Sequence, residues 1–235
     1  MMGKGLFITG TDTGVGKTFV AGTLTTLLRN RQLDVGVMKP VETGCPRQDG
    51  RLQPQDALYL QEKAGTTDPL DEICPYALEM PAAPSVAANA ADIAIDLDRI
   101  AARFGELAAR HQLTLVEGAG GMLVPLTETA DYTDLIRQLG IPVLLVARAS
   151  LGTINHTLLS VHWARHAQLP ILGVVVNSPT GPIAPSEQAN LQALATRLTV
   201  PLLGCLPYLS EASYDISLVE KSLDLARLLA LLDLG

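Results

Sequence analysis

The stretch Gly10-Thr-Asp-Thr-Gly-Val-Gly-Lys17-Thr18 decides the fold of this chain. It follows a short apolar segment, residues 5–10 (GLFITG), that is typical of a buried strand, and residues 17–31 continue it as a helix. In a glycine-rich turn of this kind, backbone N–H groups surround a ligand and the helix adds its positive end. A side chain would hold the backbone away from that ligand. The stretch therefore predicts a phosphate-binding loop at the start of an α/β domain.

The loop predicts ATP bound together with Mg²⁺. Lys17 can reach the terminal phosphates, and the hydroxyl group of Thr18 can bind the metal. Five residues separate Gly10 from Gly16, where the usual pattern has four. The alternative is a turn that binds nothing, which the strand before it and the helix after it disfavour. The residues expected to bind the nucleotide here are Asp12, Thr13, Gly14, Val15, Gly16, Lys17 and Thr18.

Beyond this loop, apolar segments alternate with amphipathic ones along the chain. Strands that are apolar throughout and separated by helices indicate a parallel sheet covered on both faces. We predict a single domain, residues 1–235, with a doubly wound, mostly parallel sheet and helices on both faces. Further strands are expected at residues 34–38, 113–117, 141–147, 171–177 and 202–206. Further helices are expected at residues 55–64, 97–111, 132–139, 153–167, 188–198 and 218–233, with polar, Pro-rich chain around and between the first two.

Composition excludes several classes of partner. The net charge is −7 and aromatic residues make up 4% of the 235 residues, which disfavours binding to nucleic acid. The most apolar segments, residues 141–147 and 225–232, are too short to span a membrane. The N-terminus leads directly into the first strand and leaves no room for a signal peptide. We therefore expect a cytoplasmic protein.

Two polar segments follow strands at the edge that carries the phosphate loop. Lys39-Pro-Val-Glu-Thr-Gly44 follows the second strand, and Glu117-Gly-Ala-Gly-Gly121 follows the third. A fixed cation such as Lys39 would stabilise charge on a transferring phosphoryl group, and Glu117 would hold the metal. Asp56, which opens the next helix, is a second candidate metal ligand. Each residue also has a plainer interpretation. Lys39 could be a solvated strand end, Glu117 a turn cap and Asp56 an ordinary acidic residue in a first helical turn.

A further segment, Leu151-Gly-Thr-Ile-Asn-His156, begins a helix after the strand at residues 141–147. Its free backbone N–H groups could hold a carboxylate. Taken alone, a Gly-Thr helix start is only a cap.

Together and in this order, these segments resemble the dethiobiotin synthetases. Residues 10–18 resemble that family's extended loop G-T-D-T-x-V-G-K-T, residues 39–44 its K-P-x-x-[ST]-G, residues 117–121 its E-G-A-G-G and residues 152–156 its G-x-I-N-H. The resemblance covers nearly the whole chain. It implies closure of a cyclic urea from 7,8-diaminopelargonic acid, CO₂ and the co-substrate ATP, through a carbamate and a carbamic-phosphoric anhydride. This sequence differs from the family pattern at Gly14, where many members carry an acidic residue.

The resemblance also implies roles for individual residues. Lys17 and Lys39 would neutralise the γ-phosphate and the carbamate, and Thr18, Asp56 and Glu117 would hold Mg²⁺. Thr13 and Thr43 would bind the carbamate and diamine, beside the small residues around Gly120. Asn177, Pro207 and Leu209 fall where the family places its adenine. The helix start, with Gly152, Thr153 and Asn155, would receive the substrate carboxylate from the other subunit of a homodimer, so that the substrate site lies at the subunit interface.

Two other functions are compatible with a phosphate loop of this kind. A nucleotide switch of the partitioning type would carry a lysine where this chain has Asp12, and a GTPase would carry Asn-Lys-x-Asp where Asn177 is followed by Ser-Pro-Thr. An amidotransferase acting on a cofactor carboxylate would need a glutaminase domain, for which 235 residues leave no room. A partner chain could supply one, so this alternative stays open.

Overall fold

Strand β1 (Lys4–Gly10) lies inside a six-stranded sheet of order β10-β9-β8-β1-β7-β2. The structure is a computed structural model, and it describes residues 4–209 and 215–234. All pairings within the sheet are parallel. The other strands are β2 (Val35–Met38), β7 (Leu113–Glu117), β8 (Val143–Arg148), β9 (Ile171–Asn177) and β10 (Leu202–Leu206). The predicted fold class, a parallel sheet in a P-loop-like α/β arrangement, is confirmed.

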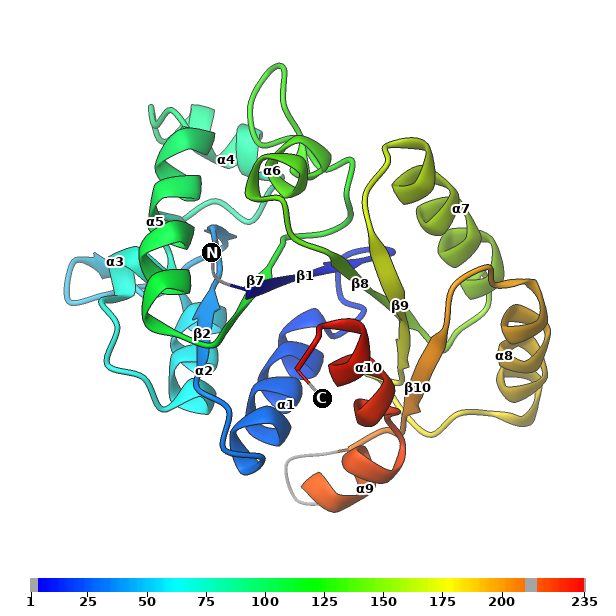
Figure 1. Ribbon diagram of the computed structural model, residues 1–235. Helices are drawn as coiled ribbons and strands as arrows, with labels where there is room; N and C mark the ends of the chain where they lie inside the picture. Colours follow the sequence, from blue (N-terminus) through cyan, green and yellow to red (C-terminus); the bar gives the residue numbers. More distant parts are fainter. Residues whose placement is uncertain (1–3, 210–214, 235) are drawn as a thin grey trace.

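Helices cover both faces of this sheet (Figure 1). On one side lie α1 (Lys17–Asn30), α2 (Gln55–Ala64), α9 (Ile216–Lys221) and α10 (Leu225–Leu231). On the other lie α5 (Leu97–Arg110), α6 (Tyr132–Leu139), α7 (Thr153–His166) and α8 (Pro185–Arg197). In the described part of the chain, no helix is long and apolar enough to cross a membrane.

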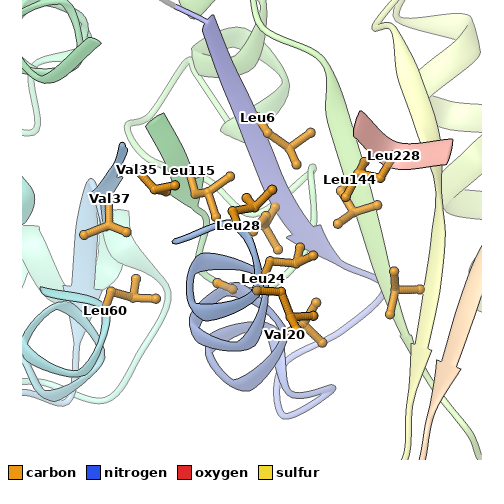
Figure 2. Packing of buried hydrophobic residues seen from close by; sticks show 14 of the residues in the cluster. Leu6, Val20, Leu24, Leu28, Val35, Val37, Leu60, Leu115, Leu144 and Leu228 are labelled. Atoms are coloured by element: carbon orange, nitrogen blue, oxygen red, sulfur yellow. The ribbon is translucent and has the colours of Figure 1, made fainter. Parts of the chain in front are cut away.

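The period of two along β1 explains the two layers. Leu6 and Ile8 point to the α1 face and Phe7 points to the opposite face, all three fully buried. Figure 2 shows Leu24 and Leu28 of α1 packed among the side chains of the sheet on the first face. Each such side chain contributes about 1.5–3 kcal/mol by leaving water. The core therefore fixes α1, and with it the turn that precedes α1.

The chain around α2, up to α5, contains elements that the sequence does not predict. Two of them are the short helices α3 (Leu70–Ile73) and α4 (Pro84–Ala90). A parallel pair also forms between β3 (Val41–Thr43) and β6 (Tyr76–Leu78), and a hairpin between β4 (Arg47–Gln48) and β5 (Arg51–Leu52). These elements have two to seven residues each. Such lengths are too short for a periodic pattern to emerge.

The single closing helix expected at residues 218–233 is also wrong. The structure has two helices, α9 and α10, separated by Ser222 to Asp224. Leu223 is buried and forms an antiparallel bridge with Gly204 of the edge strand β10. The side chain of Asp224 then accepts a hydrogen bond from the backbone N–H of Arg227 and so caps α10. Pairing with the sheet edge therefore outweighs continuation of the helix.

Charged side chains link the elements at the amino-terminal edge of the sheet. Nδ1 of His111 lies 2.9 Å from Oδ1 of Asp34, and Nε2 lies 2.7 Å from Oδ2 of Asp68. Arg110 also pairs with Asp68, at 2.9 Å. Burial opposes the charged imidazolium, but the hydrogen bonds to Asp34 and Asp68 outweigh it and raise the pKa of His111. The end of α5 is thus joined to the chain before β2 and before α3.

The raised pKa of His111 predicts a stability difference that depends on pH. Because the folded pKa lies above the unfolded value, the ion pairs stabilise the protein fully below the unfolded pKa and lose their effect as pH rises through the folded pKa. His111→Gln should lower the free energy of unfolding by roughly 1 kcal/mol at about pH 6 and by less at about pH 9. Urea denaturation at both pH values measures this, with the exposed His162→Gln as control. An equal loss at both pH values would contradict it.

Candidate functional site

The turn between β1 and α1 presents free backbone donors. Gly16 occupies the N-cap position of α1 with a φ of 88°, no side chain caps the helix, and no acidic residue lies in its first turn. The first N–H groups of a helix have no partner within the helix, and they carry the positive end of its dipole. The start of α1, which residues 12–18 form together with the turn before it, is therefore suited to bind an anion.

The side chain of Asn177 holds this turn in place. It is buried at the end of β9, and its Nδ2 donates a hydrogen bond to the backbone carbonyl of Val15 at 3.0 Å. A Cβ atom added to Gly16 would lie 2.1 Å from the same Nδ2. Gly16 is thus required both by its left-handed backbone and by the close approach of Asn177. Gly14 also has a positive φ, of 72°, but a Cβ there would meet no atom of the described residues within 4 Å.

Lys17 is buried at the start of α1. Its Nζ donates a hydrogen bond to the backbone carbonyl of Asp12 at 3.1 Å, which closes the loop around the ammonium group. Burial and the neighbouring charge of Lys39 lower the pKa of Lys17 to about 8. An anion bound in the loop would restore the charged form, because opposite charges nearby favour it.

Lys39 meets both candidate metal carboxylates. From the end of β2, its Nζ donates to Oδ2 of Asp56 at 2.8 Å and to Oε1 of Glu117 at 2.5 Å. Lys39 and Glu117 are buried, whereas the side chain of Asp56 is 40% exposed. Burial opposes the charge on Lys39, but Glu117 and Asp56 more than offset it and raise the pKa of Lys39. Three elements that are distant in sequence are joined here through one ammonium group.

Glu117 also contacts the phosphate loop. Its Oε1 accepts a hydrogen bond from Oγ1 of Thr18 at 2.8 Å. Its Oε2 is buried and has no hydrogen-bond partner among residues 4–209 and 215–234. A buried carboxylate oxygen without a partner is costly. Glu117 is therefore suited to bind a cation that the protein itself does not supply.

Glu42 is a carboxylate that sequence reasoning missed at this site. It is 6% exposed, and its two oxygens accept hydrogen bonds from the backbone N–H groups of Asp56 and Ala57, at 2.9 and 3.0 Å. Glu42 stands within the Lys39–Gly44 segment that the sequence singles out. The signal that could have found it is the missing cap of α2, whose N-cap position is Pro54.

These groups surround one cavity of about 590 Å³. The polar part of its lining consists of the loop, the lysines and the carboxylates. The apolar part comes mostly from residues 81–84 with Ala119 and Val124. The residues that line it are Thr13, Gly14, Gly16, Lys17, Thr18, Lys39, Glu42, Thr43, Asp56, Pro81, Ala82, Ala83, Pro84, Glu117, Ala119, Gly120 and Val124.

A second cavity of about 350 Å³ lies beside the first and shares Thr13, Gly120 and Val124 with it. Leu159, Ser160 and Trp163 of α7 contribute to its wall. It adjoins the first cavity at the phosphate loop and extends towards α7.

Several predicted residues do not line the first cavity. Gly152, Thr153 and Asn155 form the start of α7, where Gly152 has a φ of 93° and Asn155 is exposed. Asn177 is the last residue of β9, and Pro207 and Leu209 follow β10. All three lie at the carboxyl edge of the sheet. Arg148, which the sequence reasoning did not consider, lies at the end of β8 with its guanidinium 3.7 Å from the carboxylate of Asp12.

Comparisons with known proteins agree with this geometry. A family model described as an AAA domain matches residues 4–214. The ATP-dependent dethiobiotin synthetase BioD of Thermodesulfovibrio yellowstonii is 41% identical, over 91% of this chain and 92% of its own. That of Anaeromyxobacter dehalogenans is 46% identical, over 85% and 89%. A chain in the solved structure of the MinC:MinD cell division protein complex of Aquifex aeolicus is similar in fold, with a TM-score of 0.56. The two chains are 15% identical, and the match covers 87% of this chain and 81% of that one.

The close approach at Gly16 leads to a prediction about nucleotide affinity. Gly16→Ala should weaken ATP binding by about 100-fold or more, since a clash and backbone strain of roughly 3 kcal/mol would displace the loop. Isothermal titration calorimetry measures the affinity. Gly105→Ala is the matched control, because Gly105 lies inside α5 and a Cβ there meets no described atom within 4 Å. ATP affinity equal in the two variants would contradict the prediction.

Proposed function

This chain belongs to the family of ATP-dependent dethiobiotin synthetases, and on that premise we propose that the first cavity is where it closes the cyclic urea of dethiobiotin. The substrates would be 7,8-diaminopelargonic acid, CO₂ and ATP. The observation that carries the proposal is that the start of α1, two lysines and three carboxylates meet on one cavity. This combination suits positioning and charge neutralisation, and the reaction needs no covalent nucleophile.

The proposed reaction has three bond-forming steps. One amine of the substrate adds to CO₂ and loses a proton, which gives a carbamate. A carbamate oxygen attacks the γ-phosphorus of ATP and displaces ADP, which gives a carbamic-phosphoric anhydride. The second amine then attacks the carbamoyl carbon, loses a proton and expels inorganic phosphate. Negative charge appears on the carbamate in the first step and is carried by the phosphoryl group in the next two, so fixed cations stabilise each step.

We assign the charge neutralisation to Lys17 and Lys39. Lys17 projects into the cavity from the phosphate loop, where the γ-phosphate would lie. Lys39 faces it from the end of β2 and would hold the carbamate oxygen near the phosphorus. Thr13 and Thr43 line the same cavity, and their hydroxyl groups would bind the carbamate and the diamine. Gly120 leaves space for the substrate between them.

The residues present fit Mg²⁺. Thr18, Asp56 and Glu117 offer hard oxygen ligands, which this ion prefers, and the free Oε2 of Glu117 lacks a cation. Oγ1 of Thr18 and Oε1 of Glu117 lie 2.8 Å apart, so these two residues are close enough to hold one cation together. When bound, the ion would neutralise charge on the β- and γ-phosphates.

The apolar wall and the carboxyl edge of the sheet complete the proposed site. Residues 81–84 and Val124 would contact the alkyl chain of the diamine. Asn177 uses its amide nitrogen on Val15, which leaves its Oδ1 to accept a hydrogen bond from the adenine amino group. Pro207 and Leu209, both half-buried, would flank the base.

We further propose a homodimer in which the start of α7 of one subunit faces the substrate site of the other. Gly152, Thr153 and Asn155 would bind the substrate carboxylate, as the family resemblance implies. Leu151 beside them is 89% exposed, and Leu159 further along α7 and Leu123 are exposed as well. Exposed leucines of this kind are typical of a protein interface, which supports the dimer.

A product assay tests the function. We expect phosphate release from MgATP to depend on both the diamine and bicarbonate, and mass spectrometry to detect a product lighter than the carbamate by one water. The physical reason is that the γ-phosphate has no acceptor until the carbamate forms. Hydrolysis of ATP at the same rate without the diamine would refute the substrate assignment and leave only a nucleotide site.

A second prediction concerns the metal. Glu117→Gln should lower Mg²⁺-dependent turnover by about 100-fold, because a metal that stabilises transition-state charge contributes several kcal/mol. The steady-state rate as a function of Mg²⁺ concentration measures this. Glu106→Gln on the outer surface of α5 makes the same change in charge and should behave like the unmodified protein. Full turnover in the Glu117 variant would rule out the metal assignment.

A further inference from the structure

Helix α2 begins without a cap of its own. Its N-cap residue is Pro54, which has no side-chain oxygen, and Gln55 follows directly. The first N–H groups of a helix need partners from elsewhere when the helix start is buried, and Pro54 is buried. The carboxylate of Glu42, from another part of the chain, is the hydrogen-bond partner of two of these groups. One of its oxygens accepts from the backbone N–H of Asp56 and the other from that of Ala57. Negative charge is also favourable at this end of a helix.

Glu42 therefore connects two parts of the cavity wall. It lies in β3, three positions after Lys39, and β3 is held by its pairing with β6. The backbone N–H that it binds belongs to Asp56, whose carboxylate in turn accepts the hydrogen bond of Lys39 at 2.8 Å. The backbone and the side chain of Asp56 are thus fixed from the same segment. Among the described residues, the hydrogen bonds that join the first turn of α2 to that segment are those to Glu42 and the partly exposed ion pair of Asp56 with Lys39.

We propose that Glu42 is a positioning residue for the divalent cation, which acts by holding the start of α2 so that Asp56 faces Glu117 across the cavity. The proposal rests on the proposed function, in which Asp56 and Glu117 hold Mg²⁺. Glu42 does not touch the cation in this assignment. Both of its oxygens are engaged by backbone N–H groups, so it acts through Asp56.

The hydrogen bonds of Glu42 support a positioning role over a direct one. Its two oxygens accept from the backbone N–H groups of Asp56 and Ala57, at 2.9 and 3.0 Å. A carboxylate that is held by two N–H groups keeps its orientation and has less capacity left for a substrate amine. If Glu42 instead bound the diamine directly, its removal would weaken diamine binding and leave the cation requirement unchanged.

The test is a double-mutant cycle read as the Mg²⁺ concentration that gives half-maximal turnover. Glu42→Gln keeps the shape of the side chain but leaves only one acceptor for two N–H groups. It should raise that concentration about tenfold, as is typical of residues that orient a metal ligand, with the KM for the diamine unchanged. Asp56→Asn should raise it as well. In Asp56→Asn protein, the added Glu42→Gln change should have little further effect, because residues that act as one unit are not additive.

Mn²⁺ binding, followed by electron paramagnetic resonance with a non-hydrolysable ATP analogue, provides a readout independent of turnover and should change in parallel. Glu62→Gln is the matched control, because Glu62 lies on α2 with its side chain 73% exposed and should leave both readouts unchanged. Glu42→Asp, which keeps the charge but shortens the side chain by one methylene group, repeats the test should Glu42→Gln not accumulate as folded protein.

The possible outcomes separate the two proposals. An effect of Asp56→Asn without an effect of Glu42→Gln would overturn the positioning role alone. Full additivity of the two changes, or a rise in the KM for the diamine in place of the Mg²⁺ requirement, would also overturn it. Asp56→Asn with an unchanged Mg²⁺ requirement would overturn the metal assignment together with the positioning role built on it.

Discussion

The site depends on one buried ammonium group shared between two carboxylates. Lys39 arrives from β2, Glu117 from β7 and Asp56 from α2, so the contact exists only when the sheet order is complete. Breaking a buried pair of this kind leaves an uncompensated charge, at a cost of about 3–5 kcal/mol. The parallel sheet supplies the necessary geometry, because the carboxyl ends of adjacent strands β2, β7 and β1 meet at one edge. The fold thus assembles its cations and its carboxylates together.

The covered parallel sheet and the residues at its carboxyl edge could be predicted from the sequence. Strands that are apolar throughout can only be buried between layers, which fixes a covered parallel sheet and its carboxyl edge. The positions of Lys17, Lys39 and Glu117 follow from that edge, because Glu117 ends β7, Lys39 follows β2 and Lys17 opens the helix that follows β1. Their meeting at one cavity is a consequence of topology, and it requires no knowledge of side-chain packing.

The remaining features depend on contacts between distant residues. A helix cap is normally sought at the residue before the helix, which is Pro54 in α2. That residue shows that α2 needs a capping group from elsewhere, but no local sequence pattern identifies Glu42 as that group. The break at Leu223 is similar, since its segment is apolar enough to continue as a helix and is diverted only by the edge of β10. Tertiary contacts override local propensity in both cases. The sequence therefore predicts which side chains meet at the cavity more reliably than it predicts the contacts that hold them there.

The two lysines of the cavity are shifted in opposite directions, and this separates their functions. Carboxylates offset the burial of Lys39 within the protein, whereas burial and Lys39 lower the pKa of Lys17 to about 8. Lys39 is therefore charged before any ligand arrives and contributes to the structure of the empty site. Lys17 gains most from a new anion, because its burial is not fully offset by the described residues. An anion in the phosphate loop, beside the uncapped start of α1, is the partner that offsets it. The protein stabilises one cation by itself and leaves the other to be stabilised by its ligand.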